Sequence, residues 1–233
     1  PVLQQVEHFN NPGISQNDAF KPVTRYFDRI TRPEQILQTL PQAIQVMLDP
    51  ADCGPACISL CQDVQGETYE YPEEFFKERI HNIRRPRPDD FQIKEAAEKI
   101  KKSKNPIIIS GGGVFYSDAM EDLSNFAIKH NIPVTQTVMG YSTMKKDHSH
   151  FLGPIGGLGG KAANNFAKQT DLAIAIGTKL GDFTTGSWAN FENPKFSLVS
   201  INVARFDANK HMAQSVIGDA KVSINELSLA LGD

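Results

Sequence analysis

The pattern of apolar and polar positions divides the chain into two parts. From residue 89 onward, short apolar runs alternate with stretches in which apolar side chains recur every three or four positions. The runs predict strands at 106–110, 132–138, 172–177, 197–203 and 215–217. The helices predicted between them begin at Asp89 or Asp90 and at Ser117 or Asp118, and span 160–169 and 221–231. Continuous apolar strands alternating with helices indicate a parallel sheet covered on both faces, so we expect a doubly wound α/β domain over 89–233.

The first 66 residues carry a weaker pattern. Pro33 begins one amphipathic helix that continues to Leu48, and Gly54-Pro55 leads into an apolar strand at 56–61. One helix and one strand cannot close a sheet, so we expect an incomplete α/β segment here. Residues 67–88 are rich in proline and arginine without periodicity, which predicts a linker.

Composition excludes several classes of function. The 233 residues carry a net charge of −3, with a pI of about 6.1, so no overall field attracts nucleic acid or an anionic membrane. No apolar run approaches the ~18–20 residues of a membrane span, and no signal peptide is recognisable. We therefore expect a cytoplasmic protein with neither nucleic-acid nor membrane partners. Because the chain begins Pro1-Val2-Leu3 without methionine, we also expect a piece of a longer protein.

Three cysteines invite a metal interpretation. Cys53, Cys57 and Cys61 are evenly spaced, with three residues between each and the next. Structural zinc takes four ligands, and no histidine lies nearby in the sequence to complete a set. We therefore expect buried, reduced thiols and no metal site.

Two glycine-rich segments are candidates for binding phosphate. Gly111-Gly112-Gly113-Val114 follows the first predicted strand of the domain, where missing side chains and a helix start suit a phosphate group. The dinucleotide fingerprint fails because Tyr116 replaces its third glycine and no acid ends the second strand, so NAD is disfavoured. The segment 156–162 satisfies G-x-G-x-x-A from Gly157 but follows no clear strand. It is either a loop that opens a helix or a loop that faces a cofactor.

Other polar residues lie where predicted strands end, which is where α/β proteins bind ligands. They are Gly177, Thr178, Asp182, Thr185 and Asn202. Each is either a ligand contact or a turn former. No catalytic set stands out, because His148 and His150 lie in a stretch expected to be irregular to about residue 158, with no acid fixed beside them.

Several phrases of the sequence resemble the thiamine-diphosphate enzyme superfamily that includes the acetolactate synthases. The phrases are Asn17-Asp18-Ala19-Phe20, Arg32-Pro33, Gly54-Pro55, Gly111-Gly112-Gly113-Val114, Ile132-Pro133-Val134 and Asp171-Leu172-Ala173-Ile174-Ala175-Ile176-Gly177-Thr178. The resemblance implies that 1–66 is the C-terminal part of a pyrimidine-binding domain, 67–88 a linker and 89–233 a central Rossmann-like domain. It also implies thiamine diphosphate and Mg²⁺ in a full-length enzyme, with catalytic residues and metal ligands outside this chain.

Within the superfamily, further phrases resemble the trihydroxycyclohexane-dione hydrolases of myo-inositol catabolism. These phrases are Phe20-Lys21-Pro22-Val23, Asp28-Arg29-Ile30, Thr184-Thr185-Gly186-Ser187-Trp188 and Ile201-Asn202-Val203. The implied reaction is hydrolytic opening of a cyclic 1,2-dione by C–C bond cleavage, in a homodimer or homotetramer, and this chain alone is expected to be inactive. By analogy with the synthases, Phe20 and Lys21 are candidate substrate contacts.

Two alternatives remain. One is an acetolactate synthase-like carboligase whose central domain holds FAD. The cofactor contacts would then be Gly111, Gly112, Gly113, Val114, Gly177, Thr178, Asp182, Thr185 and Asn202. The synthases usually carry an aspartate of the FAD region where this chain has Asn202, and a glutamine where it has Lys21, which weakens the case for flavin. The other alternative is a stand-alone module that binds ADP or a flavin.

Overall fold

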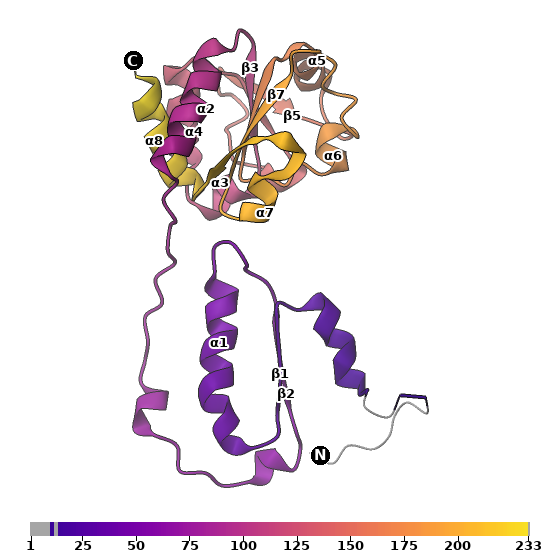
Figure 1. Ribbon diagram of the computed structural model, residues 1–233, viewed down its shortest axis with the longest axis vertical. Helices are drawn as coiled ribbons and strands as arrows, with labels where there is room; N and C mark the ends of the chain where they lie inside the picture. The colour runs from indigo at the N-terminus through magenta and orange to yellow at the C-terminus, as the bar shows by residue number, and fades with distance from the viewer. Residues whose placement is uncertain (1–9, 12–13, 233) are drawn as a thin grey trace. The chain divides into compact units, whose positions relative to one another are not determined.

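The computed structural model describes residues 10–11 and 14–232. It divides the chain into two compact units, Pro1–Arg84 and Arg85–Asp233, which are treated separately below. The element labels are those of Figure 1.

The first unit is built on a two-stranded parallel sheet. Strand β1 (Tyr26–Ile30) pairs with β2 (Ala56–Leu60) in a register that runs from Tyr26 opposite Ala56 to Ile30 opposite Leu60. Helix α1 (Ile36–Leu48) follows a short 3₁₀ turn that begins at Pro33. A small core of Ile30, Cys61 and Val64 lies beneath this helix, with Ile36 and Ile58 packed against it.

Strand β1 corrects the expectation of a single strand in this part of the chain. Its sequence, Tyr26-Phe27-Asp28-Arg29-Ile30, places charged residues in the middle of the strand, and this hid the apolar pattern. The Asp28 carboxylate is satisfied by α1, because the Thr39 hydroxyl donates to it at 2.5 Å. Asp28 thus joins β1 to α1 through a hydrogen bond.

The expectation of buried thiols is also wrong in part. All three cysteines are free thiols, but only Cys61 is buried, while Cys57 is partly exposed and Cys53 is exposed. Cys53 lies in the turn between α1 and β2, outside the strand whose pattern suggested burial, and its thiol contacts the carbonyl of Met47 at 3.2 Å.

The second unit is a six-stranded parallel sheet. Its strands are β3 (Pro106–Ser110), β4 (Val134–Gln136), β5 (Phe151–Pro154), β6 (Leu172–Ile176), β7 (Ser197–Asn202) and β8 (Gln214–Ile217). They lie in the order β5-β4-β3-β6-β7-β8, and each neighbouring pair is parallel. This order, with the first strand in the middle, confirms the predicted doubly wound α/β fold.

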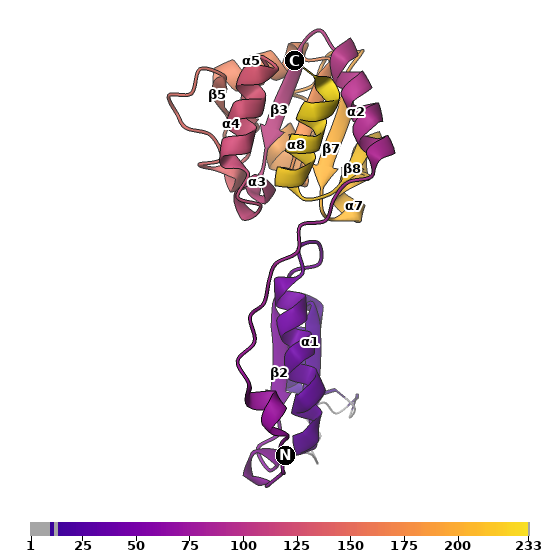
Figure 2. The ribbon, with the colours of Figure 1, turned by 90° about the vertical axis from the view of Figure 1, so that its left-hand side faces the viewer.

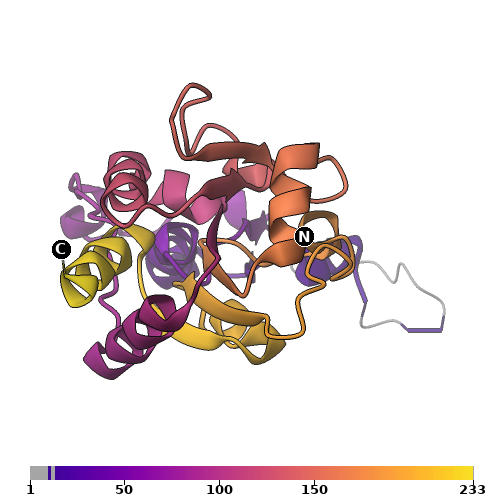
Figure 3. The ribbon, with the colours of Figure 1, turned by 90° about the horizontal axis from the view of Figure 1, so that it is seen from above.

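Helices cover both faces of this sheet. They are α2 (Asp90–Lys102), α3 (Gly112–Tyr116), α4 (Met120–Lys129), α5 (Lys161–Gln169), α6 (Asp182–Thr185), α7 (Arg205–Ala208) and α8 (Ala220–Leu231). Helices α2, α4 and α8 lie on one face, whereas α5 and α6 lie on the other (Figures 1 and 2). Figure 3 shows the same layers from above.

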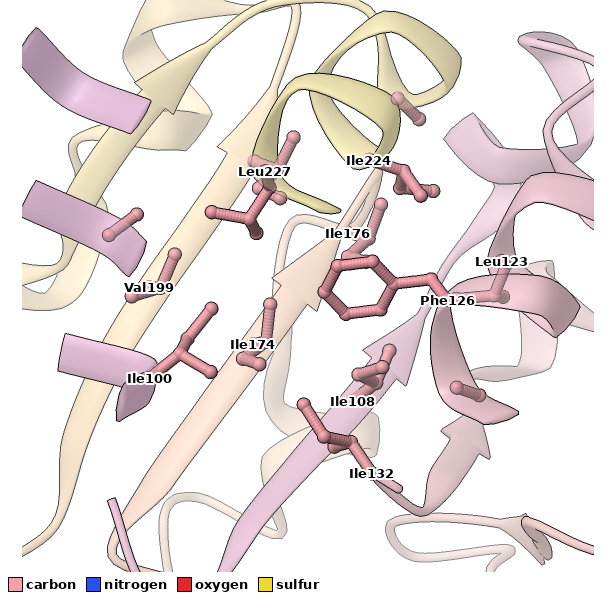
Figure 4. Packing of buried hydrophobic residues seen from close by; sticks show 14 of the residues in the cluster. Ile100, Ile108, Leu123, Phe126, Ile132, Ile174, Ile176, Val199, Ile224 and Leu227 are labelled. Atoms are coloured by element: carbon pink, nitrogen blue, oxygen red, sulfur yellow. The ribbon is translucent and has the colours of Figure 1, made fainter. Parts of the chain in front are cut away.

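The larger core lies between the sheet and helices α2, α4 and α8. Ile108, Ile174 and Val199 project from three adjacent strands toward Phe126 of α4 and Leu227 of α8 (Figure 4). All five side chains are at most 2% exposed. Because strand β6 is buried along its whole length, its sequence Leu-Ala-Ile-Ala-Ile is apolar at every position rather than alternating.

Several elements in this unit differ from the sequence-based expectation. Strand β4 covers 134–136 rather than 132–138, and the short helices α6 and α7 were not expected. Strand β5 lies within the stretch expected to be irregular. It is a short edge strand that ends in Gly153-Pro154, and these residues gave no strand signal. Helix formation also resumes earlier than Ser117, because α3 begins at Gly112, directly after β3. The glycines therefore form the first turn of a helix as well as the turn that precedes it.

Asp171 fixes the amino-terminal end of β6. Its carboxylate accepts hydrogen bonds from the Ser103 hydroxyl and from the amide groups of Lys104, at 2.8 Å, and Asn105, at 3.0 Å. Burial alone would raise the pKa of Asp171, but these hydrogen bonds outweigh it and hold the pKa below the usual value of 3.8. The loop that leads into β3 is thus joined to the strand beside it.

Replacing Ile174 with alanine should destabilise the second unit by about 2–5 kcal/mol, because it leaves a cavity in the middle of the sheet. Urea unfolding followed by circular dichroism would measure the loss. Leu229→Ala is the matched control, because Leu229 lies on α8 with 76% of its surface exposed, and it should change stability little. A comparable loss in both variants would contradict the assigned core.

The Asp171 contacts should make stability depend on pH. A carboxyl whose pKa is lowered by folding stabilises the native state above its unfolded pKa, and this contribution disappears as the pH falls through the lower, native pKa. Asp171→Asn should therefore be less stable at pH 7 and lose less stability than the parent chain between about pH 4 and pH 2. Urea titrations across this range test it. Glu98→Gln, an exposed carboxylate on α2, should retain the parent pH dependence.

Candidate functional site

The centre of the sheet provides the place where doubly wound proteins bind ligands. Strands β3 and β6 are neighbours, and the helices that follow them pass to opposite faces of the sheet. Their carboxyl ends are therefore the usual ligand position in this fold. Gly111 follows β3 there and Gly177 follows β6.

These two glycine segments pack against each other, backbone to backbone. The Gly113 amide donates to the Gly177 carbonyl at 2.9 Å, and the Gly111 amide donates to the Ile176 carbonyl at 2.8 Å. A Cβ atom at Gly113 would lie 2.6 Å from the Gly177 Cα atom, and Gly177 itself has a φ of +61°. Only glycine permits this approach at both positions.

The geometry also tests whether the Gly111–Val114 loop suits a nucleotide phosphate. A phosphate cradle requires amide groups that point to open space. Here the amides of Gly111 and Gly113 are bonded to the β6 segment, and the Val114 amide donates to the Gly111 carbonyl at 3.1 Å. The space beside Gly111 is filled by the Gly177 carbonyl and the Thr178 side chain. As arranged, the loop closes on its neighbour, and we derive no nucleotide chemistry from it.

Asn202 extends this set of contacts to the next strand. Its side-chain amide donates to the Thr178 carbonyl at 3.2 Å, and its side-chain oxygen accepts from the Ala204 amide at 3.0 Å. The side chain is buried, with 9% exposure. Asn202 thus ties the turn after β7 to the turn after β6.

The remaining two strand-end candidates lie in helix α6. Asp182 begins this helix and is exposed, whereas Thr185 is buried and its hydroxyl lies 3.5 Å from the Gly181 carbonyl. The structure therefore brings Gly111, Gly113, Gly177, Thr178 and Asn202 together, and it leaves the Asp182 carboxylate at the surface.

The second glycine-rich segment is also held by contacts of its own. Both the amide and the carbonyl of Gly156 bond to the Asn164 side chain of α5, each at 3.0 Å. The Gly157 amide donates to the Phe183 carbonyl at 2.8 Å. Gly156 has a φ of +99°, and a Cβ atom there would lie 1.9 Å from the Phe183 carbonyl oxygen. This segment opens helix α5 and joins it to α6.

In the first unit, Phe20 and Lys21 lie on a 3₁₀ helix, Gln16–Val23. The Lys21 ammonium is 2.6 Å from the Asp18 carboxylate and 5.2 Å from the centre of the Phe27 ring. The hydrogen bond from Lys21, followed by that from the Ser15 amide, lowers the pKa of Asp18 below 3.8. Lys21 is therefore presented as a cation in a defined position, while Phe20 is 52% exposed beside it.

A polar cluster that the sequence did not mark lies at the carboxyl ends of β3 and β4. The Ser110 hydroxyl donates to the Thr135 carbonyl at 3.0 Å and lies 2.7 Å from the Thr143 hydroxyl, and all three residues are buried. Gln136 ends β4, and its side-chain oxygen is buried without a hydrogen-bond partner among the described residues. The rule that strand ends carry ligand contacts would have included Gln136 had the end of β4 been located.

The described residues do not form a metal or diphosphate site. Within 10–11 and 14–232, no three His, Cys, Asp or Glu side chains lie close enough to share a metal ion. Gly218-Asp219 resembles the start of a Gly-Asp-Gly motif, but the Asp219 carboxylate caps α8 and pairs with Arg85 at 3.1 Å. These residues do not fit the diphosphate and Mg²⁺ of thiamine diphosphate, and we assign them no step of its chemistry.

Fold and site together define an open, doubly wound α/β domain whose usual ligand position lies between the carboxyl ends of β3 and β6. A family model described as "Thiamine pyrophosphate enzyme, central domain" matches residues 93–227. The chain therefore belongs to the thiamine pyrophosphate enzyme family and contains its central domain.

Relatives of known name support the same conclusion. The chain is 50% identical over 231 residues to 3D-(3,5/4)-trihydroxycyclohexane-1,2-dione hydrolase of Clostridium perfringens strain 13, covering 99% of this chain and 36% of that protein. It is 47% identical over 227 residues to the enzyme of the same name from Bacillus subtilis strain 168, covering 97% and 36%. The chain thus spans about a third of the length of these relatives.

A solved structure shows the same fold. The X-ray structure of a protein described as a thiamin diphosphate-dependent enzyme, isolated from Mycobacterium smegmatis, aligns with a TM-score of 0.75 at 18% identity. The alignment covers 98% of this chain and 44% of that one. In the described part of this chain, no helix has the length and apolar character needed to cross a bilayer.

Gly177→Ala should destabilise the second unit by at least about 2 kcal/mol, because alanine is strained at a left-handed φ and its Cβ would meet the Gly113 backbone. Thermal unfolding would show a melting point about 4–8 °C lower. Gly181→Ala is the control on the same connection, because no atom lies within 4 Å of a Cβ placed there. Equal melting points for the two variants would contradict the close contact of the two glycine segments.

Proposed function

We propose that this chain is part of a thiamine-diphosphate-dependent hydrolase that opens the ring of trihydroxycyclohexane-1,2-dione by C–C bond cleavage in myo-inositol degradation. The observation that supports it most is the 50% identity to the Clostridium perfringens hydrolase across 99% of this chain. The similarity continues through both units and so includes Phe20 and Lys21 as well as the central domain.

The full-length enzyme would bind thiamine diphosphate and Mg²⁺ through residues outside this chain. When bound, thiamine diphosphate supplies a carbon nucleophile and an electron sink for C–C cleavage. We propose that the enzyme acts in the cytoplasm as a homodimer or homotetramer. The three free thiols accord with a reducing compartment.

The contribution of this chain to substrate recognition is proposed to lie in Lys21 and Phe20. The ion pair with Asp18 and the contact with Phe27 hold the Lys21 ammonium in place without using all of its three N–H donors. A donor held in this way can bind an oxygen of the dione or one of its hydroxyls. The exposed ring of Phe20 supplies an adjoining apolar surface.

The nine residues predicted to contact a cofactor, from Gly111 to Asn202, remain a prediction as nucleotide contacts. No contact found in the structure favours the carboligase alternative with FAD, because Asn202 and the amides of Gly111, Gly113 and Val114 bond to the protein itself. The relatives reported above carry hydrolase names, which gives no support to a stand-alone nucleotide-binding module.

Lys21→Ala in the full-length enzyme should lower kcat/KM for the dione at least tenfold, which corresponds to about 1.4 kcal/mol of transition-state stabilisation. A steady-state assay of ring opening measures it. Lys77→Ala is the matched control, because Lys77 forms an exposed ion pair with Glu74 at the same three-residue spacing. Unchanged activity in Lys21→Ala would remove this lysine from the site, and an equal loss in Lys77→Ala would point to a general effect of charge.

A further inference from the structure

The two carboxylate oxygens of Asp18 have different partners on the 3₁₀ helix Gln16–Val23. The Oδ1 atom is 2.6 Å from the Lys21 ammonium, whereas the Oδ2 atom accepts a hydrogen bond from the Ser15 amide at 2.7 Å. Asp18 lies in the first turn of this helix and Lys21 in its last turn. One oxygen therefore closes the start of the helix, and the other fixes a side chain near its end.

A second contact on the Lys21 ammonium comes from strand β1. The ammonium lies 5.2 Å from the centre of the Phe27 ring, which is within the range of a cation–π interaction. Phe27 is half-buried and pairs with β2 through the backbone of β1, so the sheet fixes its position. The ammonium is thus held by a carboxylate of the helix and by a ring of the strand.

Such contacts matter for a lysine that is to recognise a ligand. Lysine carries its charge on a flexible four-carbon stem, and 55% of the Lys21 side chain is exposed. Without partners, the ammonium would sample many rotamers, and a ligand would have to restrict them on binding. Held in one position, it loses less freedom when it donates to the ligand, and the orientation of reacting groups strongly affects rates.

The carboxylate that holds Lys21 is ionised at neutral pH. The hydrogen bond from Lys21 is the largest cause that lowers the pKa of Asp18, followed by that from the Ser15 amide, and the charge of Arg29 in β1 adds to the effect. Ion pairs at this degree of exposure contribute little to protein stability. Loss of the pair should therefore affect the placement of Lys21 more than the folding of the chain.

We propose that Asp18 is a positioning residue, which holds the Lys21 ammonium where it can donate to an oxygen of the dione. This inference rests on the proposed function, because it takes Lys21 as the substrate contact. Asp18 acts through Lys21 and needs no contact with the substrate of its own. In an enzyme without the lysine, the charge of Asp18 should therefore contribute nothing to activity.

Asp18→Asn in the full-length enzyme separates the two roles of the carboxylate, because the asparagine oxygen can still accept from the Ser15 amide while the ion pair is lost. We expect kcat/KM for the dione to fall about threefold or more, with little change in melting point. In a Lys21→Ala background the same substitution should cause no further fall. Glu74→Gln is the matched control, because Glu74 pairs with Lys77 at the same spacing, and it should leave activity unchanged.

The outcomes of this cycle separate the positioning role from the proposed function. Parent-like activity of Asp18→Asn beside an impaired Lys21→Ala would overturn the positioning role and leave the substrate contact in place. An equal fall from Asp18→Asn in both backgrounds would show a general structural effect and would also overturn it. Full activity of Lys21→Ala would refute the proposed substrate contact, and the positioning role with it.

An NMR titration of the Asp18 carboxyl in the 233-residue chain tests the ion pair without substrate or cofactor. Lys21→Ala should raise the pKa of Asp18 toward its ordinary value of 3.8, because the largest cause of the lowering is removed. Lys77→Ala should leave this pKa as it is in the parent chain. If the pKa of Asp18 is the same with and without Lys21, the pair does not form in solution and the positioning role is overturned.

Discussion

The approach of two glycine backbones at the centre of the sheet governs the geometry of the second unit. Gly113 and Gly177 contact each other directly, and the Gly177 amide in turn donates to Ile201 of β7 at 2.9 Å. Asn202 then bonds to Thr178. The carboxyl ends of β3, β6 and β7 are thereby joined by consecutive contacts. Because each contact uses a polar group of the loops, these groups are already paired within the protein.

Polar groups that are already hydrogen-bonded within the protein are not available to a ligand at the carboxyl ends of these strands. Large apolar side chains are exposed on the segments that follow the strands: Tyr116 at the end of α3, Leu158 after β5 and Phe183 in α6 are each more than 70% exposed. One strand away, at the end of β4, the Gln136 side-chain oxygen is buried without a hydrogen-bond partner among the described residues.

Much of this fold was predictable because its central strands are buried on both faces. Strands such as β6 and β7 appear as continuous apolar runs, and the amphipathic helices alternate with them. Strands β1 and β5 escaped prediction for physical reasons. The Asp28 carboxylate in β1 accepts hydrogen bonds from the Arg29 amide and from the Gln35 and Thr39 side chains, which follow the strand in sequence. Strand β5 is an edge strand ending in glycine and proline. The candidate site was harder to predict, because residue spacing does not show that the Gly113 amide donates to the Gly177 carbonyl.

The comparisons separate the determinants of fold from those of substrate. The Mycobacterium smegmatis structure shares the fold at 18% identity, so a small share of identical residues accompanies the same arrangement of strands and helices. A scaffold shared at that distance cannot specify one substrate. Specificity must reside in side chains that the fold does not require, and Lys21, which we propose as a substrate contact, meets this condition. It stands on a 3₁₀ helix rather than in the core, and 55% of its side-chain surface is exposed. The proposed role of its charge in recognition is therefore separate from the packing of the core.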